Sequence, residues 1–209
     1  MRGCLASRVS AVSFSRCLVL AVGTLVLSGC ISPKAYVDRS LGDVPPDKRV
    51  VVANPHPVQL IFEFQTKGAT NSRGTKALAP QAMSAANDSR VFSEISSSPV
   101  SNGAVLSIKI NNVPITDDAA AKGFMTGLTF GLAGTAVTDG YVCTVDYLPG
   151  GDAPRVTTQV KHAIHTVIGN KSPPPNSDRA ASLDEAAFKV TRQMVSHGLN
   201  QLAADPKFK

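Results

Sequence analysis

Four stretches of the chain alternate apolar and polar side chains at every second residue, and this pattern constrains the fold more than any other feature. The stretches are residues 58–66, 104–113, 141–148 and 155–168. In the second stretch, for example, Leu106, Ile108 and Ile110 fall on one face, with polar residues between them. A period of two is typical of a β-strand with one buried face. The sequence therefore predicts a sheet of about four strands that is covered on one side.

Two further segments carry apolar residues at helical spacing. The first, residues 75–91, places Leu78 and Ala82 on one face, with Pro80 expected in its first turn. The second begins at Ser182, which with the glutamate three residues later forms the pattern of a capping box. These two segments are predicted to be helices.

The predicted order of elements is β-α-β-β-β-α, which favours an α+β fold. A sheet with one apolar face is buried most simply by packing both helices on that face. We therefore expect a two-layer sandwich, in which a mostly antiparallel sheet of about four strands carries two helices on one face. The expected single domain spans residues 50–205, and the polar, proline-containing residues 30–49 before it are expected to form a tether.

The first 29 residues differ in character from the rest of the chain. Three arginines and no acidic residue precede Cys30, and residues 17–27 form an uncharged apolar run. That run has the length of a signal-peptide core and is too short for a membrane-spanning helix, which needs about 20 residues. The tetrapeptide Leu27-Ser28-Gly29-Cys30 follows directly.

This tetrapeptide resembles the lipobox of bacterial prolipoproteins. In that family the cysteine thiol receives a diacylglyceryl group, a peptidase cuts before the cysteine, and the new amine is acylated. The resemblance implies that residues 1–29 are a signal peptide that is removed, and that Cys30 carries lipid (palmitate-type acyl chains) that anchors the lipoprotein to a membrane. Ile31 stands where an aspartate favours inner-membrane retention, so the resemblance implies the outer membrane, facing the periplasm. The alternative is an ordinary secretory signal followed by a chance cysteine.

Charge and cysteine content narrow the possible functions. Without residues 1–29 the chain has 18 basic and 15 acidic residues, and it has no run of Lys or Arg. No nucleic-acid partner is therefore expected. Cys143 is the one thiol left once the signal is removed and Cys30 is lipidated, so no intrachain disulfide can form. Because it lies in an alternating run, it is expected to be a buried small hydrophobe.

No catalytic or metal-binding pattern stands out. His162 and His165 are three residues apart in a predicted strand, so they face opposite sides and cannot share a metal ion. We expect His162 to be half-buried and His165 to be exposed. The chain has no nucleophile elbow, phosphate loop or zinc-ligand spacing. The sequence therefore predicts that the protein is not an enzyme and has no catalytic residues, metal or cofactor.

An insert at residues 119–139 interrupts the predicted strands. No charge occurs from Gly123 to Thr138, and Gly123, Gly127 and Gly131 are four residues apart. On a helix that spacing lets a second helix approach closely. The candidate membrane or oligomer contacts are Gly123, Phe124, Gly127, Leu128, Phe130 and Gly131. Three interpretations stay open: the insert packs on the protein's own sheet, contacts a membrane or another subunit, or lines a pocket for an apolar ligand.

The insert, with the sequence Val-Thr-Asp-Gly-Tyr that ends at Tyr141, resembles a passage in uncharacterised Gram-negative outer-membrane lipoproteins. The resemblance covers most of residues 50–205 and implies no activity. The leading hypothesis is a non-catalytic, lipid-anchored accessory protein that binds a periplasmic or envelope partner, either protein or glycan. The alternatives are a subunit of an oligomeric membrane assembly for export or transport, which uses segment 123–134, and a carrier of lipid or another apolar ligand.

Overall fold

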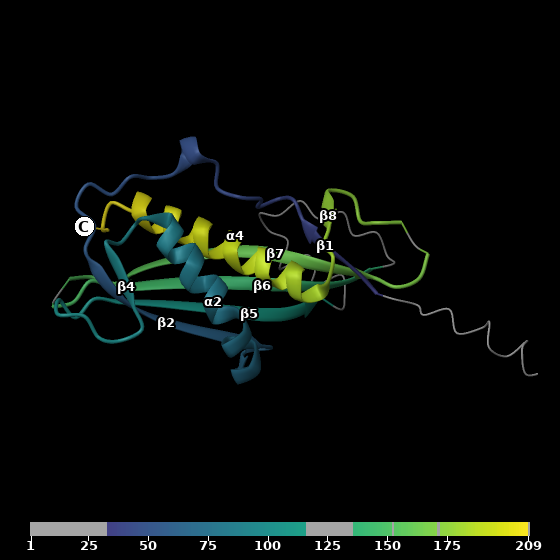
Figure 1. The fold of residues 1–209 in the computed structure, drawn as a ribbon, viewed down its shortest axis with the longest axis horizontal. Helices are drawn as coiled ribbons and strands as arrows, with labels where there is room; N and C mark the ends of the chain where they lie inside the picture. Colours follow the sequence, from purple (N-terminus) through teal and green to yellow (C-terminus); the bar gives the residue numbers. More distant parts are fainter. Residues whose placement is uncertain (1–32, 116–135, 152, 171, 209) are drawn as a thin grey trace, which may run out of the picture. The chain divides into compact units, whose positions relative to one another are not determined.

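Two helices pack on one face of an eight-stranded sheet in the computed structural model (Figure 1). The structure describes residues 33–115, 136–151, 153–170 and 172–208. Cys30 and the candidate contact residues in segment 123–134 lie outside these ranges. No helix in the described ranges is long and apolar enough to cross a membrane.

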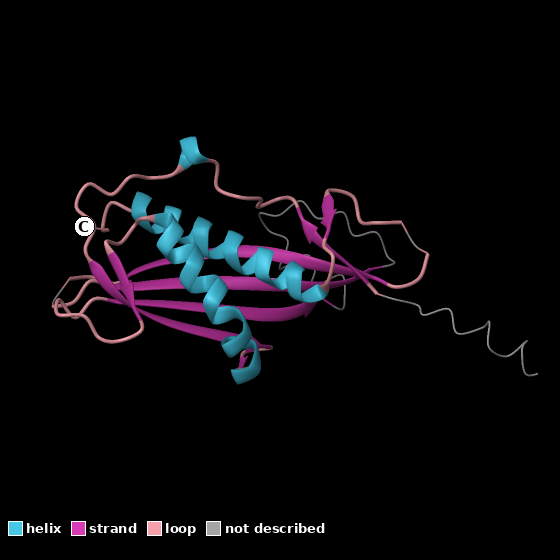
Figure 2. Ribbon diagram, viewed as in Figure 1, coloured by secondary structure: helices cyan, strands magenta, loops and turns pink. Residues whose placement is uncertain are grey.

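The strands, magenta in Figure 2, form a mixed sheet that is mostly antiparallel. Its strands are β1 (Lys34–Asp38), β2 (Pro57–Thr66), β3 (Ala69–Thr70), β4 (Glu94–Ser96), β5 (Val105–Ile115), β6 (Ala136–Leu148), β7 (Val156–Val167) and β8 (Ser177–Arg179). The spatial order is β3-β2-β5-β6-β7-β1-β8, and β4 pairs with β2. Only the pairs β2–β4 and β2–β5 are parallel among those described. A parallel β2–β5 pair requires a crossover, which α2 (Ser72–Ser89) provides.

The predicted α+β class, with two helices on one face of the sheet, is confirmed, but the predicted number of strands is wrong. The four alternating stretches correspond to β2, β5, β6 and β7. The structure adds β1, β3, β4 and β8, which have between two and five residues. Strands of this length show too few alternations to be recognised from periodicity. Strand β6 also begins at Ala136, so the last residues of the predicted insert belong to the sheet.

Residues Lys34–Asp38, predicted to lie in the tether, form β1 instead. This strand pairs with β7, with Lys34 opposite Val167, and with β8 on its other side. Its side chains from Ala35 to Asp38 are buried. The tether was predicted from the overall polar and proline-containing composition of residues 30–49. A strand of only five residues does not show in a composition taken over twenty residues. Three residues, 31–33, are then left between Cys30 and the sheet.

Both helices begin at polar caps. The predicted capping box of α4 (Leu183–Ala204) is confirmed, because Ser182 Oγ accepts from the backbone N–H of Glu185 at 3.0 Å. Helix α2 begins earlier than predicted, since Asn71 Oδ1 accepts from the N–H of Gly74 at 2.8 Å. Pro80 therefore lies inside the helix rather than in its first turn.

The two helices bury the apolar face of the sheet, as the alternation predicted. The largest fully buried side chains include Leu106 and Ile108 of β5 and Met194 and Leu199 of α4. Helix α4 packs against α2, β7 and β6. The face of α4 that points away from the sheet contacts the segment that precedes β2. The candidate site lies between that segment and the helices.

Candidate functional site

A groove of about 1460 Å³ separates the segment Asp43–Val52 from helices α2 and α4. The segment crosses the helices in an extended conformation and contains the one-turn 3-10 helix η1 (Pro46–Lys48). Val51, Val52 and Phe188 supply apolar surface to the groove, and charged side chains of the segment and both helices surround them. The groove combines apolar and charged surface, a combination typical of sites that bind a ligand or a partner chain.

Polar residues of α4 hold the segment over the helices. Asn200 Oδ1 accepts from the N–H of Val50 at 2.7 Å, and its Nδ2 donates to the carbonyl of Lys48 at 3.1 Å. Gln193 Nε2 donates to Asp43 Oδ1 at 3.0 Å. His197 lies near the backbone next to that aspartate, and residues 41 and 42 there partly offset the lowering of its pKa by burial. Sequence reasoning missed these contacts, although the polar residues at positions 193, 197 and 200 share one helix face, which is the signal that indicates them.

The carboxylates around the groove already have partners. Asp88 pairs with Arg192 at 3.2 Å, and Asp43 accepts from Gln193. Glu185 Oε2 accepts from a backbone N–H of the α4 cap at 2.6 Å. These contacts leave the acidic groups less available to neutralise other cations.

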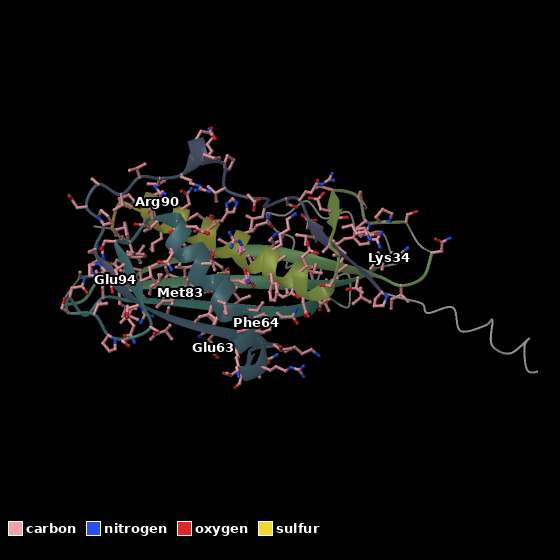
Figure 3. The ribbon with its side chains drawn as sticks, in the orientation of Figure 1. Lys34, Glu63, Phe64, Met83, Arg90 and Glu94 are labelled. Atoms are coloured by element: carbon pink, nitrogen blue, oxygen red, sulfur yellow. The ribbon has the colours of Figure 1, made fainter. Side chains whose placement is uncertain are left out.

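Two guanidinium groups of the groove contrast with those carboxylates. The exposed side chains of Arg49 and Arg90 make no ion pair or side-chain hydrogen bond with any described residue. Their backbones are nevertheless held in place. Arg49 lies between the two residues that Asn200 binds, and Arg90 is the left-handed C-cap of α2 (Figure 3). The groove therefore presents two positive groups whose backbones are held in place and that have no ion-pair partner among the described residues.

A chain of hydrogen bonds joins the groove to the core. His162 Nδ1 accepts from the N–H of Ala163 at 2.8 Å, so the ring proton is on Nε2, which donates to Gln193 Oε1 at 2.8 Å. Gln193 in turn donates to Asp43. His162 is buried rather than half-buried as predicted, and burial lowers the pKa of its imidazole.

His165 was predicted to be exposed, and that prediction is wrong. It faces away from His162, as predicted, but it is 2% exposed and its ring lies beside the buried side chains of Thr138 on β6 and Asp38 on β1. Its Nδ1 is 2.9 Å from Thr138 Oγ1, and its Nε2 is 3.5 Å from Asp38 Oδ2. Burial raises the pKa of Asp38, but hydrogen bonds from His165 and Ser40 outweigh it and hold that pKa below its ordinary value.

The Thr138–His165–Asp38 arrangement has the residue types of a hydrolytic triad, but its surroundings differ from those of an active site. All three side chains are buried, and none of them lines the groove. A nucleophile needs access to its substrate. Cys143 is also fully buried, as predicted, and burial raises the pKa of its thiol to about 12. Among the described residues, no group of three or more His, Cys, Asp or Glu side chains is arranged to hold a metal ion.

The stability of the domain is expected to fall as the pH drops from 7.5 to 5. Burial lowers the pKa of His162, His56 and His197 below the ordinary 6.5, so the unfolded chain binds protons before the folded one does. The stabilisation that depends on the neutral rings is fully present well above the ordinary pKa of 6.5. It is lost as the pH falls from that value through the lower pKa values of the folded state. Urea unfolding of residues 33–209 at several pH values measures this loss.

The change His162→Gln should make the dependence on pH shallower, because it removes the most deeply buried of these three rings. The exposed α4 change Gln201→Ala should leave the dependence as it is. Equal unfolding free energies at pH 7.5 and pH 5 in the unaltered chain would contradict the prediction.

Comparison with known proteins gives distant similarity only. No protein-family model and no curated protein matches the chain. It is similar to two structures of the PelC dodecamer from Paraburkholderia phytofirmans. One, a single-substitution variant, has 11% identity over 81% of this chain and 95% of that chain, with a TM-score of 0.32. The other has 9% identity over 81% and 96%, with a TM-score of 0.33.

A third solved structure, described as an uncharacterized protein, has 11% identity over 78% of this chain and 94% of that chain, with a TM-score of 0.27.

Proposed function

We propose that this chain is a non-catalytic, lipid-anchored accessory protein of the cell envelope, which binds a partner in the groove over α2 and α4. The lipobox supports lipidation at Cys30, and Ile31 supports an outer-membrane location facing the periplasm. The groove, with two exposed guanidinium groups that have no ion-pair partner in the part of the chain that the structure describes, is the observation that carries the binding function.

The chemistry of the groove indicates what the partner presents. A guanidinium group binds carboxylate or phosphate oxygens with two parallel hydrogen bonds, and such charge-assisted bonds are stronger than neutral ones. Arg49 and Arg90 are available for this role, whereas Arg192 is occupied by Asp88. Val51 adds an almost fully exposed apolar side chain beside them. The proposed partner therefore carries anionic groups next to apolar surface, as an envelope protein or an acidic glycan does.

Charge reversal in the groove is expected to abolish partner capture in the native host. A photo-cross-linking amino acid at Val51 should give an adduct of one defined mass. The double change Arg49→Glu and Arg90→Glu should reduce that adduct at least tenfold, since each charge-assisted hydrogen bond contributes about 1.5–3 kcal/mol. The exposed residue Lys109, on β5, offers a control for charge reversal itself, because Lys109→Glu makes, away from the groove, the same change of charge as each of the two groove substitutions.

The experiment has clear contrary outcomes. Equal cross-linking from Val51 in the double variant and in the Lys109→Glu control would contradict a role for the groove. Mass spectrometry of the N-terminal peptide from the same cells checks the anchor. An unmodified or uncleaved Cys30 would contradict the lipoprotein assignment.

The second candidate function is a subunit of an oligomeric membrane assembly that uses segment 123–134. One observation favours it: Ile115 at the end of β5 pairs with Thr138 near the start of β6. The chain between them therefore leaves and re-enters the sheet at adjacent positions, with a glycine-rich sequence in between that carries no charge from Gly123 to Thr138. An adduct of twice the chain's mass, from a cross-linker placed at Val137, would favour this candidate over the first.

A further inference from the structure

We propose that one end of the sheet, formed by the start of β1, the start of β6 and the end of β7, rests on the surface of the lipid bilayer that holds the anchor. This inference depends on the lipidation of Cys30 in the proposed function and adds an orientation to it. We call this surface the bilayer-facing end. It is argued from strand register, chain length and the positions of exposed apolar side chains.

Strand register brings the bilayer-facing end together. Lys34, the first residue of β1, is opposite Val167 on β7, and Val167 is opposite Ala136, the first residue of β6. Neighbouring strands lie about 4.8 Å apart, so Lys34 and Ala136 are separated by roughly 10 Å. Figure 3 labels Lys34 close to where the described chain begins. The point where the chain enters the domain thus lies beside the start of β6.

Chain length then limits how far this end can be from the membrane. Cys30 precedes Lys34 by four residues. An extended chain covers at most about 3.6 Å per residue, so the acylated cysteine is within about 14 Å of the sheet. Two or more acyl chains keep that cysteine at the bilayer surface. A tether through residue 49 would instead reach roughly 70 Å and would leave the domain free to turn in any direction.

Exposed apolar side chains lie at the same end. Val137, the second residue of β6, is 56% exposed, and Ile168, directly after β7, is 54% exposed. They are two of the five large hydrophobic side chains exposed among the described residues. Opposite Val137 is Thr166, two residues before Ile168, so the two apolar positions are near neighbours on adjacent strands.

The energetics favour contact of these side chains with lipid. Complete burial of a valine or isoleucine side chain contributes roughly 1.5–3 kcal/mol, and contact with the acyl boundary recovers part of it. A lysine near anionic lipid head groups adds about 1 kcal/mol, and Lys34 is in position to do so. The acyl chains supply most of the affinity, so these contacts set the orientation of the domain.

Fluorescence quenching by spin-labelled lipid tests the inference on the mature lipidated protein, which begins at Cys30. Single cysteines replace Ile168, Val137 or, as the control, Ile61, which is 49% exposed in the middle of β2. The native thiols do not interfere, because Cys30 is acylated and burial raises the pKa of the Cys143 thiol to about 12. Each variant is labelled with an environment-sensitive dye. Each is then reconstituted in vesicles of phosphatidylethanolamine and phosphatidylglycerol that contain doxyl-labelled lipid.

We expect doxyl lipid to quench the dye at residues 168 and 137 several-fold more than at residue 61. Equal quenching at the three positions would overturn the inference. So would quenching of residues 168 and 137 by a nitroxide-labelled second copy of the chain and not by lipid, because that end would then be a contact between subunits. Mass spectrometry of each sample separates the two proposals. An unlipidated Cys30 counts against the proposed function, whereas lipidated protein with unquenched dyes overturns the orientation alone.

Discussion

A chain that begins at Val50 is expected to remain unfolded, whereas a chain that begins at Pro33 folds. Residue 50 is the domain boundary that composition suggests, but starting there removes β1 and its pairing with β7 and β8. Val37 of β1 is 2% exposed, and burial of such a side chain contributes roughly 1.5–3 kcal/mol by itself. Tyr36 and Ala35 are lost with it. Because whole domains are stable by about 5–15 kcal/mol, the sum of these losses is sufficient to prevent folding.

Truncation at residue 50 also removes the neighbours of β7 on one side. Without β1, the buried His165 loses Asp38, and β7 becomes an open edge of the sheet. Open edges with unpaired backbone groups promote aggregation. Circular dichroism and light scattering of residues 33–209 and 50–209 measure the outcome.

Point substitutions separate the role of β1 from chain length. In residues 33–209, Val37→Asp should unfold the domain, because it places an unpaired charge in the core. The control Val51→Asp should leave stability within about 0.5 kcal/mol, because Val51 is almost fully exposed. If residues 50–209 unfolded at the same urea concentration as residues 33–209, β1 would not be part of the stable domain.

Replacing Gly198 with leucine is expected to lift α4 off the sheet and to unfold the protein. A Cβ atom at this position would lie 2.7 Å from Val145 Cγ2, and Val160 is also in contact range. Both valines are buried in the core, so neither can move without disturbing other side chains. The Gly198 carbonyl also accepts from Thr158 Oγ1 at 3.0 Å, which ties the helix to β7. The glycine is therefore required by the close approach of helix and sheet.

The smaller change Gly198→Ala should leave a folded protein whose free energy of unfolding can be measured. At an exposed helical position, Gly to Ala stabilises by about 1 kcal/mol, because alanine is the better helix former. Here we expect the opposite sign, a loss of about 1–3 kcal/mol from overpacking, measured by urea unfolding. Gln201→Ala is the control, since it introduces alanine at an exposed position of the same helix. A Gly198→Ala protein as stable as the unaltered chain would contradict the close packing of α4.

Much of the fold was predictable because it is encoded by residues that are neighbours in sequence. Alternation placed Leu106, Ile108 and Ile110 on the buried face of β5, and the structure agrees. The Ser182 cap of α4 was recognised from four consecutive residues. Patterns of this kind depend on backbone geometry alone, which repeats every two residues in a strand and about every 3.6 in a helix.

The candidate site was not predictable in the same way. Its contacts join residues about 150 positions apart, such as Asn200 with Val50 and Gln193 with Asp43. From the sequence alone, a polar residue on α4 is expected to be exposed to solvent. Only the structure shows that the segment Asp43–Val52 contacts it. The absence of ion-pair partners for Arg49 and Arg90 among the described residues likewise appears only when the neighbouring side chains are in place.

The sequence by itself determined the α+β class, the four long strands, the two helices and the face of the sheet that they cover. Tertiary structure alone decided that Lys34–Asp38 is a strand, that His165 is buried and that a groove lies over α4. The physical reason is that a short strand is stable only when its partners supply hydrogen bonds and apolar contacts. For β1 those partners are β7 and β8, more than a hundred residues further along the chain.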